Sequence, residues 1–492
     1  MEYTTKRLAF TFFLKLINLF AFSVIIYCME NSVDLNEKKK EYLKAEQNRV
    51  AKTYISAFIA TSVFVVPLTI WPFFTQRYFF PKMVMLYIFG FILLAMMPLL
   101  KDKEAFRRYI KDGAAISLIV FILSTTITLF YSINIKLSLF GSFERRETYF
   151  IFLVYFLFFT ATFLGYEYKK WHLILFALMI SLVAIYALFQ LGGIEIGDLF
   201  PFSKYQVHES WKYKAFSTLG NPNFLASMMA MAFPILFFVF VDSKKPIWLL
   251  PLSLNYFVLL ATRTRGSWIA VFLIFILMTI VMLKNKYSLK MILIVLLVLL
   301  VLTLFYSLLF ENLFVRIGSA FKTIGTVINP KDEKELMNAG SSRIAIWKAV
   351  LMLIKKKPLT GYGIETLAQA VKEDTEIYSF LQKFGPNLVN VDKAHNEFLN
   401  IWVSSGLVAG FSYLSFAFFV FLKGVRNIRY EKMIIPLLGA FLAYFMQAMF
   451  NISNNGIAFI FYIIAGIILS LCQRKDNRSK DLKVIYGKNE IK

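Results

Sequence analysis

The sequence predicts an all-α fold, a polytopic transmembrane bundle of about 12–13 helices with one large loop outside the membrane. Of its 492 residues, 58% are hydrophobic and only 17% are charged, which is too few to cover a soluble protein of this length. The apolar residues form runs of about 18 or more, long enough for a helix to cross about 30 Å of hydrocarbon. In lipid the backbone groups must be hydrogen-bonded within the protein, either in helices or in a barrel. These runs lack the period-two alternation of barrel strands, so helices are predicted.

Hydropathy indicates about thirteen spans. The first, at residues 8–28, lacks a small-residue cleavage site and is interpreted as a retained span rather than a signal peptide. The others are expected near residues 53–74, 83–100, 114–134, 149–165, 172–191, 223–241, 247–262, 267–283, 291–310, 396–422, 433–450 and 456–472.

The basic residues predict how the chain is oriented. The formal charge of +24 does not indicate nucleic-acid binding, because Lys and Arg lie in short loops beside apolar spans, where they set orientation and contact lipid headgroups. One side collects the basic loops, and we expect it to be cytoplasmic together with the C-terminus. Those loops are residues 38–49, 101–111, 169–170, 244–245, 284–290 and 423–432. The domains expected from this pattern are an extra N-terminal span with a charged cytoplasmic loop (1–52), a transmembrane core (53–310), an extracytoplasmic loop (311–394), C-terminal spans (395–472) and a basic cytoplasmic tail (473–492).

Polar motifs gather on the predicted outer side. In KAFSTLGNPNFLA (residues 214–226), Asn221 suits an N-cap and Pro222 the first helical position, so a helix with an anion-friendly end should start there. The simpler interpretation is that Asn-Pro only starts a span. In TRTRGSW, Arg263 and Arg265 lie between two spans with almost no loop, where they either reach headgroups or bind a phosphate through their planar forks.

The long loop should contain an amphipathic helix over residues 342–356, with Ile346, Val350, Leu353 and Ile354 on one face. Arg343 and Trp347 are four residues apart and therefore adjacent on that helix. We expect the helix to lie along the outer surface of the membrane, unless it is only a structural interfacial helix.

His395 closes the loop as one of three His in the chain. A single His cannot build a zinc site, and no cluster of metal ligands lies nearby in the sequence, so no metal is expected. Its ordinary pKa suits a general base, and Asp392, three residues earlier, could orient the ring. The alternative is an interfacial polar residue at a helix start.

Together these segments resemble the O-antigen ligase and Wzy-type polymerase family of bacterial membrane glycosyltransferases. The resemblance rests on PKMVML (81–86), FSTLGNPNFLA, TRTRG, the RIAIWKAV and PLTGYG run, and AHNEFLNIWVSSGLVAG (394–410), in matching order from about residue 55 to 470. Residues 1–52 look like an addition to the usual twelve spans.

The resemblance implies a GT-C-like, inverting enzyme of the bacterial cytoplasmic (inner) membrane, working without metal, nucleotide sugar or other cofactor. It would move a glycan from an undecaprenyl-pyrophosphate carrier to a glycan, lipid or protein acceptor on the extracytoplasmic side. The roles that carry over are pyrophosphate binding for Arg265 and Arg343 and activation of the acceptor for His395. Arg263 and Arg146 are further candidates, and Lys214 stands where the family often has Arg, keeping the charge but losing the bidentate fork.

Other functions stay open at this point. The sequence does not separate a ligase from a polymerase, whose acceptor is another lipid-linked repeat. A lipid-linked glycan transporter or flippase is the main rival, although transporters usually bury carboxylates or His within their spans, and these spans are almost free of Asp and Glu. A non-catalytic assembly factor is the third possibility.

Overall fold

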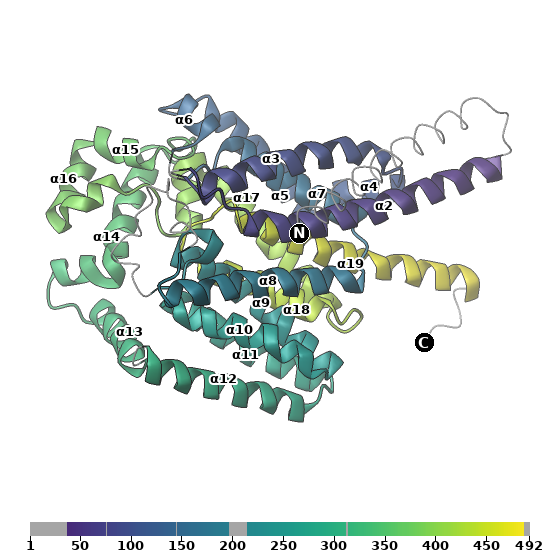
Figure 1. Cartoon of the computed structure of the whole chain (residues 1–492). Coiled ribbons are helices and arrows are strands. Elements are labelled where there is room, and N and C mark those ends of the chain that lie inside the picture. Colours follow the sequence, from purple (N-terminus) through teal and green to yellow (C-terminus); the bar gives the residue numbers. More distant parts are fainter. Residues whose placement is uncertain (1–36, 75, 144, 196–213, 311–312, 487–492) are drawn as a thin grey trace.

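The computed structural model describes residues 37–74, 76–143, 145–195, 214–310 and 313–486, so the predicted span at 8–28 lies outside it. In this part of the chain every regular element is a helix, as predicted. Figure 1 shows a bundle of long helices with a lobe of shorter helices at one end. The α-helices are α2 (Glu37–Leu68), α3 (Phe79–Met96), α4 (Lys103–Ile110), α5 (Gly113–Leu129), α6 (Ile135–Phe140), α7 (Tyr149–Gly165), α8 (Lys170–Leu191), α9 (Pro222–Ser243), α10 (Leu249–Ala261), α11 (Arg265–Lys284), α12 (Leu289–Leu309), α13 (Leu313–Ile328), α14 (Glu333–Lys356), α15 (Leu367–Glu373), α16 (Thr375–Phe384), α17 (Glu397–Asn427), α18 (Ile434–Ala448) and α19 (Ala458–Tyr486).

The bundle has the helices of a membrane protein. Among the described residues, seven helices are long and apolar enough to cross a membrane, and an eighth span results if α4 and α5, bent by 69°, count as one. Shorter apolar helices fill the other predicted ranges. Large apolar side chains are exposed on the outer helices, for example Phe91 (73%) and Leu308 (85%). Such a surface suits contact with lipid rather than water.

The centre of the bundle is α9. Its apolar window is 100% buried, whereas that of α12 at the edge is 22% buried. Helices α10, α11 and α18 pack around α9 and cover it. The start of α9 is therefore held rigidly at the end of the bundle that faces the lobe (Figure 1).

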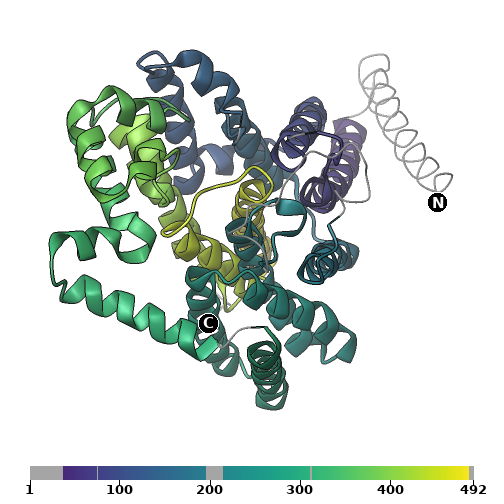
Figure 2. The ribbon, with the colours of Figure 1, turned by 60° about the vertical axis from the view of Figure 1, so that its left-hand side comes forward.

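The lobe is formed by α14, α15, α16 and the 3₁₀ turn η6 (Pro386–Asn390), seen in green in Figure 2. It has its own apolar core, in which Ile346, Val350, Leu353 and Ile354 of α14 are buried beside Ile377 and Leu381 of α16. These four α14 side chains share a face, as predicted. The predicted contact between that face and the membrane surface is wrong. Apolar side chains from the rest of the loop cover the face instead.

The PLTGYG motif attaches the lobe to the bundle. Helix α17 is interrupted at Gly406, whose φ of 77° is left-handed. There the backbone N–H of Tyr362 donates to Val403 O (2.9 Å) and that of Leu407 donates to Pro358 O (2.8 Å). Gly361 is needed at this crossing, because a Cβ would lie 2.6 Å from the backbone of Ser404.

Helices run across two of the predicted domain boundaries. The charged stretch before residue 52, expected as a loop, is helical from Glu37 onward and runs directly into the span as α2. Its Glu, Lys, Ala and Leu residues are strong helix formers, so nothing in it stops the helix. At the other end, α19 continues past residue 473 to Tyr486, into the range expected to be a tail.

Candidate active site

Four basic side chains from three segments of the chain line one pocket of about 400 Å³ where the bundle meets the lobe. They are Lys214, Arg263, Arg265 and Arg343, all of them predicted from the sequence. The other lining residues are Asn223, Thr264, Gly266, Ser341, Gln447, Phe450 and Asn451. Among the described residues the lining thus holds four cations and no carboxylate, a composition that favours an anion.

A tight turn presents two of the arginines. Helix α10 ends at Ala261 and α11 begins at Arg265, so the connection is as short as predicted. Arg263 reverses the chain with a left-handed φ of 56°. The turn is braced because the Thr262 hydroxyl (2.7 Å) and the Trp268 indole N–H (2.9 Å) both donate to Leu259 O.

The start of α9 lies beside this turn. Asn221 caps the helix by accepting from Asn223 N at 2.8 Å, and Pro222 is the first helical residue, as predicted. The Thr264 hydroxyl donates to Asn223 Oδ1 at 3.2 Å, which joins the helix start to the arginine turn. The N–H groups of Phe224 and Leu225 are already bonded to Asn221 O, so the start of α9 adds positive potential to the pocket through its helix dipole.

A backbone hydrogen bond positions Lys214 at the pocket. The N–H of the next residue, Ala215, donates to Ala261 O at 3.1 Å, which holds this segment against the end of α10. The following 3₁₀ turn, η4 (Ser217–Leu219), is held by buried Lys82 of the PKMVML motif, whose ammonium donates to Thr218 O (2.6 Å) and Thr69 O (2.8 Å). That motif is therefore a brace for the segment before α9.

Arg343 comes to the same pocket from the lobe. Helix α14 breaks at residues 339–342, where Gly340, Ser341 and Ser342 have φ near 60°, and its second half starts at Arg343. Burial and the positive charge of Arg265 both lower the pKa of Arg343. The two guanidinium groups are thus close enough to repel, and an anion between them would relieve that repulsion.

His395 lies next to Arg343 but does not line the basic pocket itself. Trp347, one turn after Arg343, donates its indole N–H to Ala394 O at 3.0 Å, which ties the His395 segment to α14. Burial, then the positive charges of Arg343 and Arg145, lower the pKa of His395 to about 4 against the opposing charge of Asp392. At neutral pH the ring is therefore uncharged, and its buried Nδ1 has no hydrogen-bond partner among the described residues.

Two of the predicted site residues make contacts other than those expected. Asp392 does not orient the His395 ring, because its carboxylate accepts from Arg145 Nε at 2.5 Å and acts on the ring only through its charge. Arg146 is not among the residues that line the basic pocket. Its Nε donates to Gln76 Oε1 at 3.3 Å and its guanidinium lies 5.3 Å from the ring of Phe143.

A buried ion cluster beneath His395 was missed by the sequence analysis. The ammonium of Lys393, 3% exposed, lies 2.7 Å from Glu365 and 3.1 Å from Glu147. The Ser453 hydroxyl also donates to Glu147 at 2.7 Å. The cluster ties the residues before His395 to two other loops. The only signal in the sequence was that these charged residues flank the motifs.

No group of three or more His, Cys, Asp or Glu side chains in the described part of the chain is placed to hold a metal ion. Fold and site together define a polytopic helical membrane protein with a pocket lined by basic residues at one end. Residues 248–414 match the family model for O-Antigen ligase. Over that segment the match confirms the resemblance to the O-antigen ligase/Wzy family seen in the motifs.

The matched segment contains Arg263, Arg265, Arg343 and His395, whereas Lys214 precedes it. Among curated proteins, no sequence matches this chain.

Proposed function

We propose that the protein transfers a glycan from an undecaprenyl-pyrophosphate carrier to an acceptor hydroxyl at the outer face of the bacterial cytoplasmic membrane, as an O-antigen ligase does. The observation that carries the proposal is the pocket shared by Lys214, Arg263, Arg265 and Arg343, with His395 next to the last of them.

The basic pocket suits the pyrophosphate. Guanidinium groups bond two phosphate oxygens at once, and the positive end of the α9 dipole lies beside them. The described residues that line the pocket include four basic side chains and no carboxylate, so this lining favours an anion. The same groups would stabilise the negative charge that develops as the pyrophosphate leaves.

Two neighbouring pockets suit the other parts of such a donor. An apolar pocket of about 360 Å³ between α10, α11 and α12 includes Leu260 and Trp268, which flank the arginine turn, and it could take part of the isoprenoid chain. A second pocket, of about 490 Å³, shares Arg265 and Ser341 with the basic pocket and extends along α13 and α14. It offers room for the glycan on the lobe side.

In the proposed step the acceptor oxygen attacks the anomeric carbon while the bond from that carbon to the pyrophosphate oxygen breaks with inversion. The electron pair leaves on the pyrophosphate, and the hydroxyl proton passes to the neutral ring of His395. The low pKa makes His395 a weak base in the empty site. A bound pyrophosphate offsets the charge of Arg343, raises the pKa of His395 and so improves the base once the donor is in place.

The test is reconstitution of the purified protein in liposomes with a defined lipid-linked oligosaccharide and one acceptor at a time, with products sized by mass. We expect one glycan on a non-donor acceptor, lost in His395→Ala and kept in Arg146→Ala. Growth of the lipid-linked chain itself would instead show a polymerase. Movement of the labelled donor across the bilayer without a new glycosidic bond would overturn the enzymatic proposal.

A further inference from the structure

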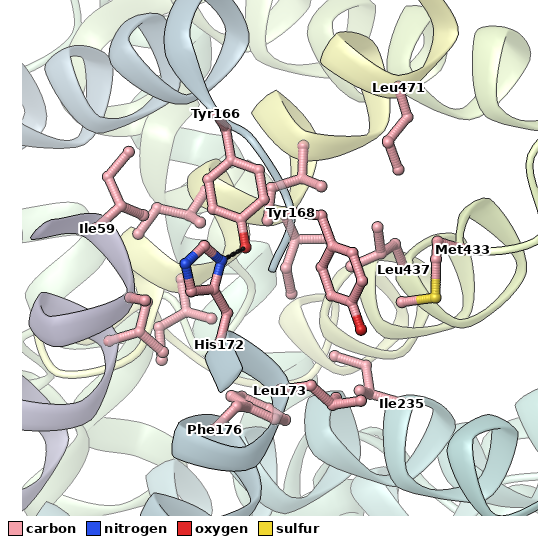
Figure 3. Close-up of a pocket in the computed structure, with 16 residues that line it drawn as sticks. Ile59, Tyr166, Tyr168, His172, Leu173, Phe176, Ile235, Met433, Leu437 and Leu471 are labelled. Atoms are coloured by element: carbon pink, nitrogen blue, oxygen red, sulfur yellow. Dashed lines mark hydrogen bonds between the residues drawn. The ribbon is translucent and has the colours of Figure 1, made fainter. Parts of the chain in front are cut away.

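A narrow apolar pocket lies at the end of the bundle away from the lobe, between α2, α8, α9, α18 and α19 (Figure 3). Its volume is about 100 Å³. Sixteen residues line it, and most are aliphatic, including Ile59, Val63, Ile235, Leu437 and Leu471. A pocket of this kind, walled by hydrocarbon and set among membrane spans, suits part of an acyl chain.

A polar pocket of about 360 Å³ adjoins it, because both are lined by Tyr166 and Tyr168. Three cations line the polar pocket, namely Lys52, Arg108 and Lys169, against two carboxylates, Asp102 and Glu167. Lys52 is paired with Asp102 at 2.9 Å, which leaves Arg108 and Lys169 beside the single carboxylate of Glu167 in the described lining. The basic residues Lys101, Lys103, Arg107 and Lys111 are exposed nearby and line neither pocket.

His172 stands between the two regions. It is 6% exposed and lines the apolar pocket. Its Nδ1 is hydrogen-bonded to the hydroxyl of Tyr166 at 2.9 Å, the dashed line in Figure 3, whereas its Nε2 is buried with no partner among the described residues. A buried nitrogen left unpaired in an apolar wall is costly, unless a ligand supplies an oxygen to it.

We infer that the two adjoining pockets bind one anionic phospholipid from the membrane leaflet at this end. Its phosphate would lie near Arg108 and Lys169, its glycerol ester oxygens at the level of His172, and one acyl chain in the apolar pocket. A free phosphate would leave the apolar part empty, and a zwitterionic lipid would not use the excess positive charge. Such a lipid would link α2, α8 and α19 and thus stabilise the bundle, whatever reaction occurs at the other end.

The experiment uses the full chain in nanodiscs of phosphatidylcholine, with or without phosphatidylglycerol. Bound lipid is identified by native mass spectrometry, and the melting temperature is measured in parallel. The double variant Arg108→Gln/Lys169→Gln is compared with Lys103→Gln/Arg107→Gln, which removes the same charge from exposed positions on the same side. A third variant, Ala60→Leu, narrows the apolar pocket without changing charge.

We expect phosphatidylglycerol to raise the melting temperature and to remain bound in the control. Its affinity should fall about 25-fold in the pocket variant, because each of the two basic groups near an anionic headgroup contributes roughly fivefold. It should also fall in Ala60→Leu if that variant folds. Equal lipid binding by the pocket and control variants would overturn the inference. The same stabilisation by inorganic phosphate alone would also overturn it, since that would indicate an anion site.

Discussion

Replacing Arg343 with Gln should raise the pKa of His395. Burial and neighbouring positive charge lower this pKa from 6.5 to about 4, which corresponds to about 3 kcal/mol of disfavoured protonation. Burial is the largest cause and Arg343 the next, so removing Arg343 should recover only part of this shift. The pKa should therefore rise above about 4 and remain below its ordinary value of 6.5, because the ring stays buried.

The assay is an NMR titration of labelled histidine in nanodiscs, with the signal of His395 assigned from its loss in His395→Gln. A matched control is Lys348→Gln, which removes a cation from the same helix at an exposed position paired with Glu333. Adding a pyrophosphate lipid analogue to the unchanged protein should also raise the pKa, because the ligand offsets the same positive charge. An unchanged or lower pKa in Arg343→Gln would refute the reasoning that Arg343 acts on the ring.

Three further outcomes are expected. Arg265→Ala should weaken binding of a pyrophosphate lipid about ten- to hundredfold in a titration, while Arg146→Ala should leave it nearly unchanged, because only the first lines the pocket. Asp392→Asn should lower the pKa of His395 further, because the carboxylate opposes the positive charges around the ring. Lys393→Met should cost about 3–5 kcal/mol of stability, seen as a lower melting temperature, because it leaves two buried carboxylates uncompensated.

Each of these has a clear contrary result. Equal donor affinity for the two arginine variants would remove the assigned role of the basic pocket. A rise in the pKa of His395 in Asp392→Asn would show that the Asp392 carboxylate does not favour protonation of the ring. A melting temperature for Lys393→Met equal to that of Lys383→Met, an exposed control, would show that the ion cluster is not needed for stability.

Much of the fold was predictable because a membrane leaves few choices. Apolar runs of span length without strand alternation form helices in a membrane, and helices lie at all the predicted ranges among the described residues. The start of α9 was also predictable, because the preferences for Asn at the N-cap and Pro at the first helical position depend on local sequence alone. Asn221 and Pro222 take these two positions.

Tertiary partners could not be predicted in the same way. Nothing in the sequence distinguishes Arg145 from Arg146, yet only the first reaches Asp392, because a left-handed turn at Arg146 directs the two side chains to different neighbours. The apolar face of α14 has the pattern of an interfacial helix, and only the folded lobe shows that protein covers it.

The cluster around Lys393 was equally hidden from the sequence. It joins residues more than two hundred positions apart, from the loops that hold Glu147 and Glu365. A motif search finds His395, but it does not show which residues hold the segment on which His395 lies.

The most direct test of the central claim measures donor binding and glycan transfer on the same His395→Ala preparation, reconstituted with a defined pyrophosphate-linked oligosaccharide. We expect this variant to bind the donor as tightly as the unchanged protein but to form no glycosidic bond. Transfer at the unchanged rate would contradict the role of His395 as the base, since some other group would then take the proton from the acceptor.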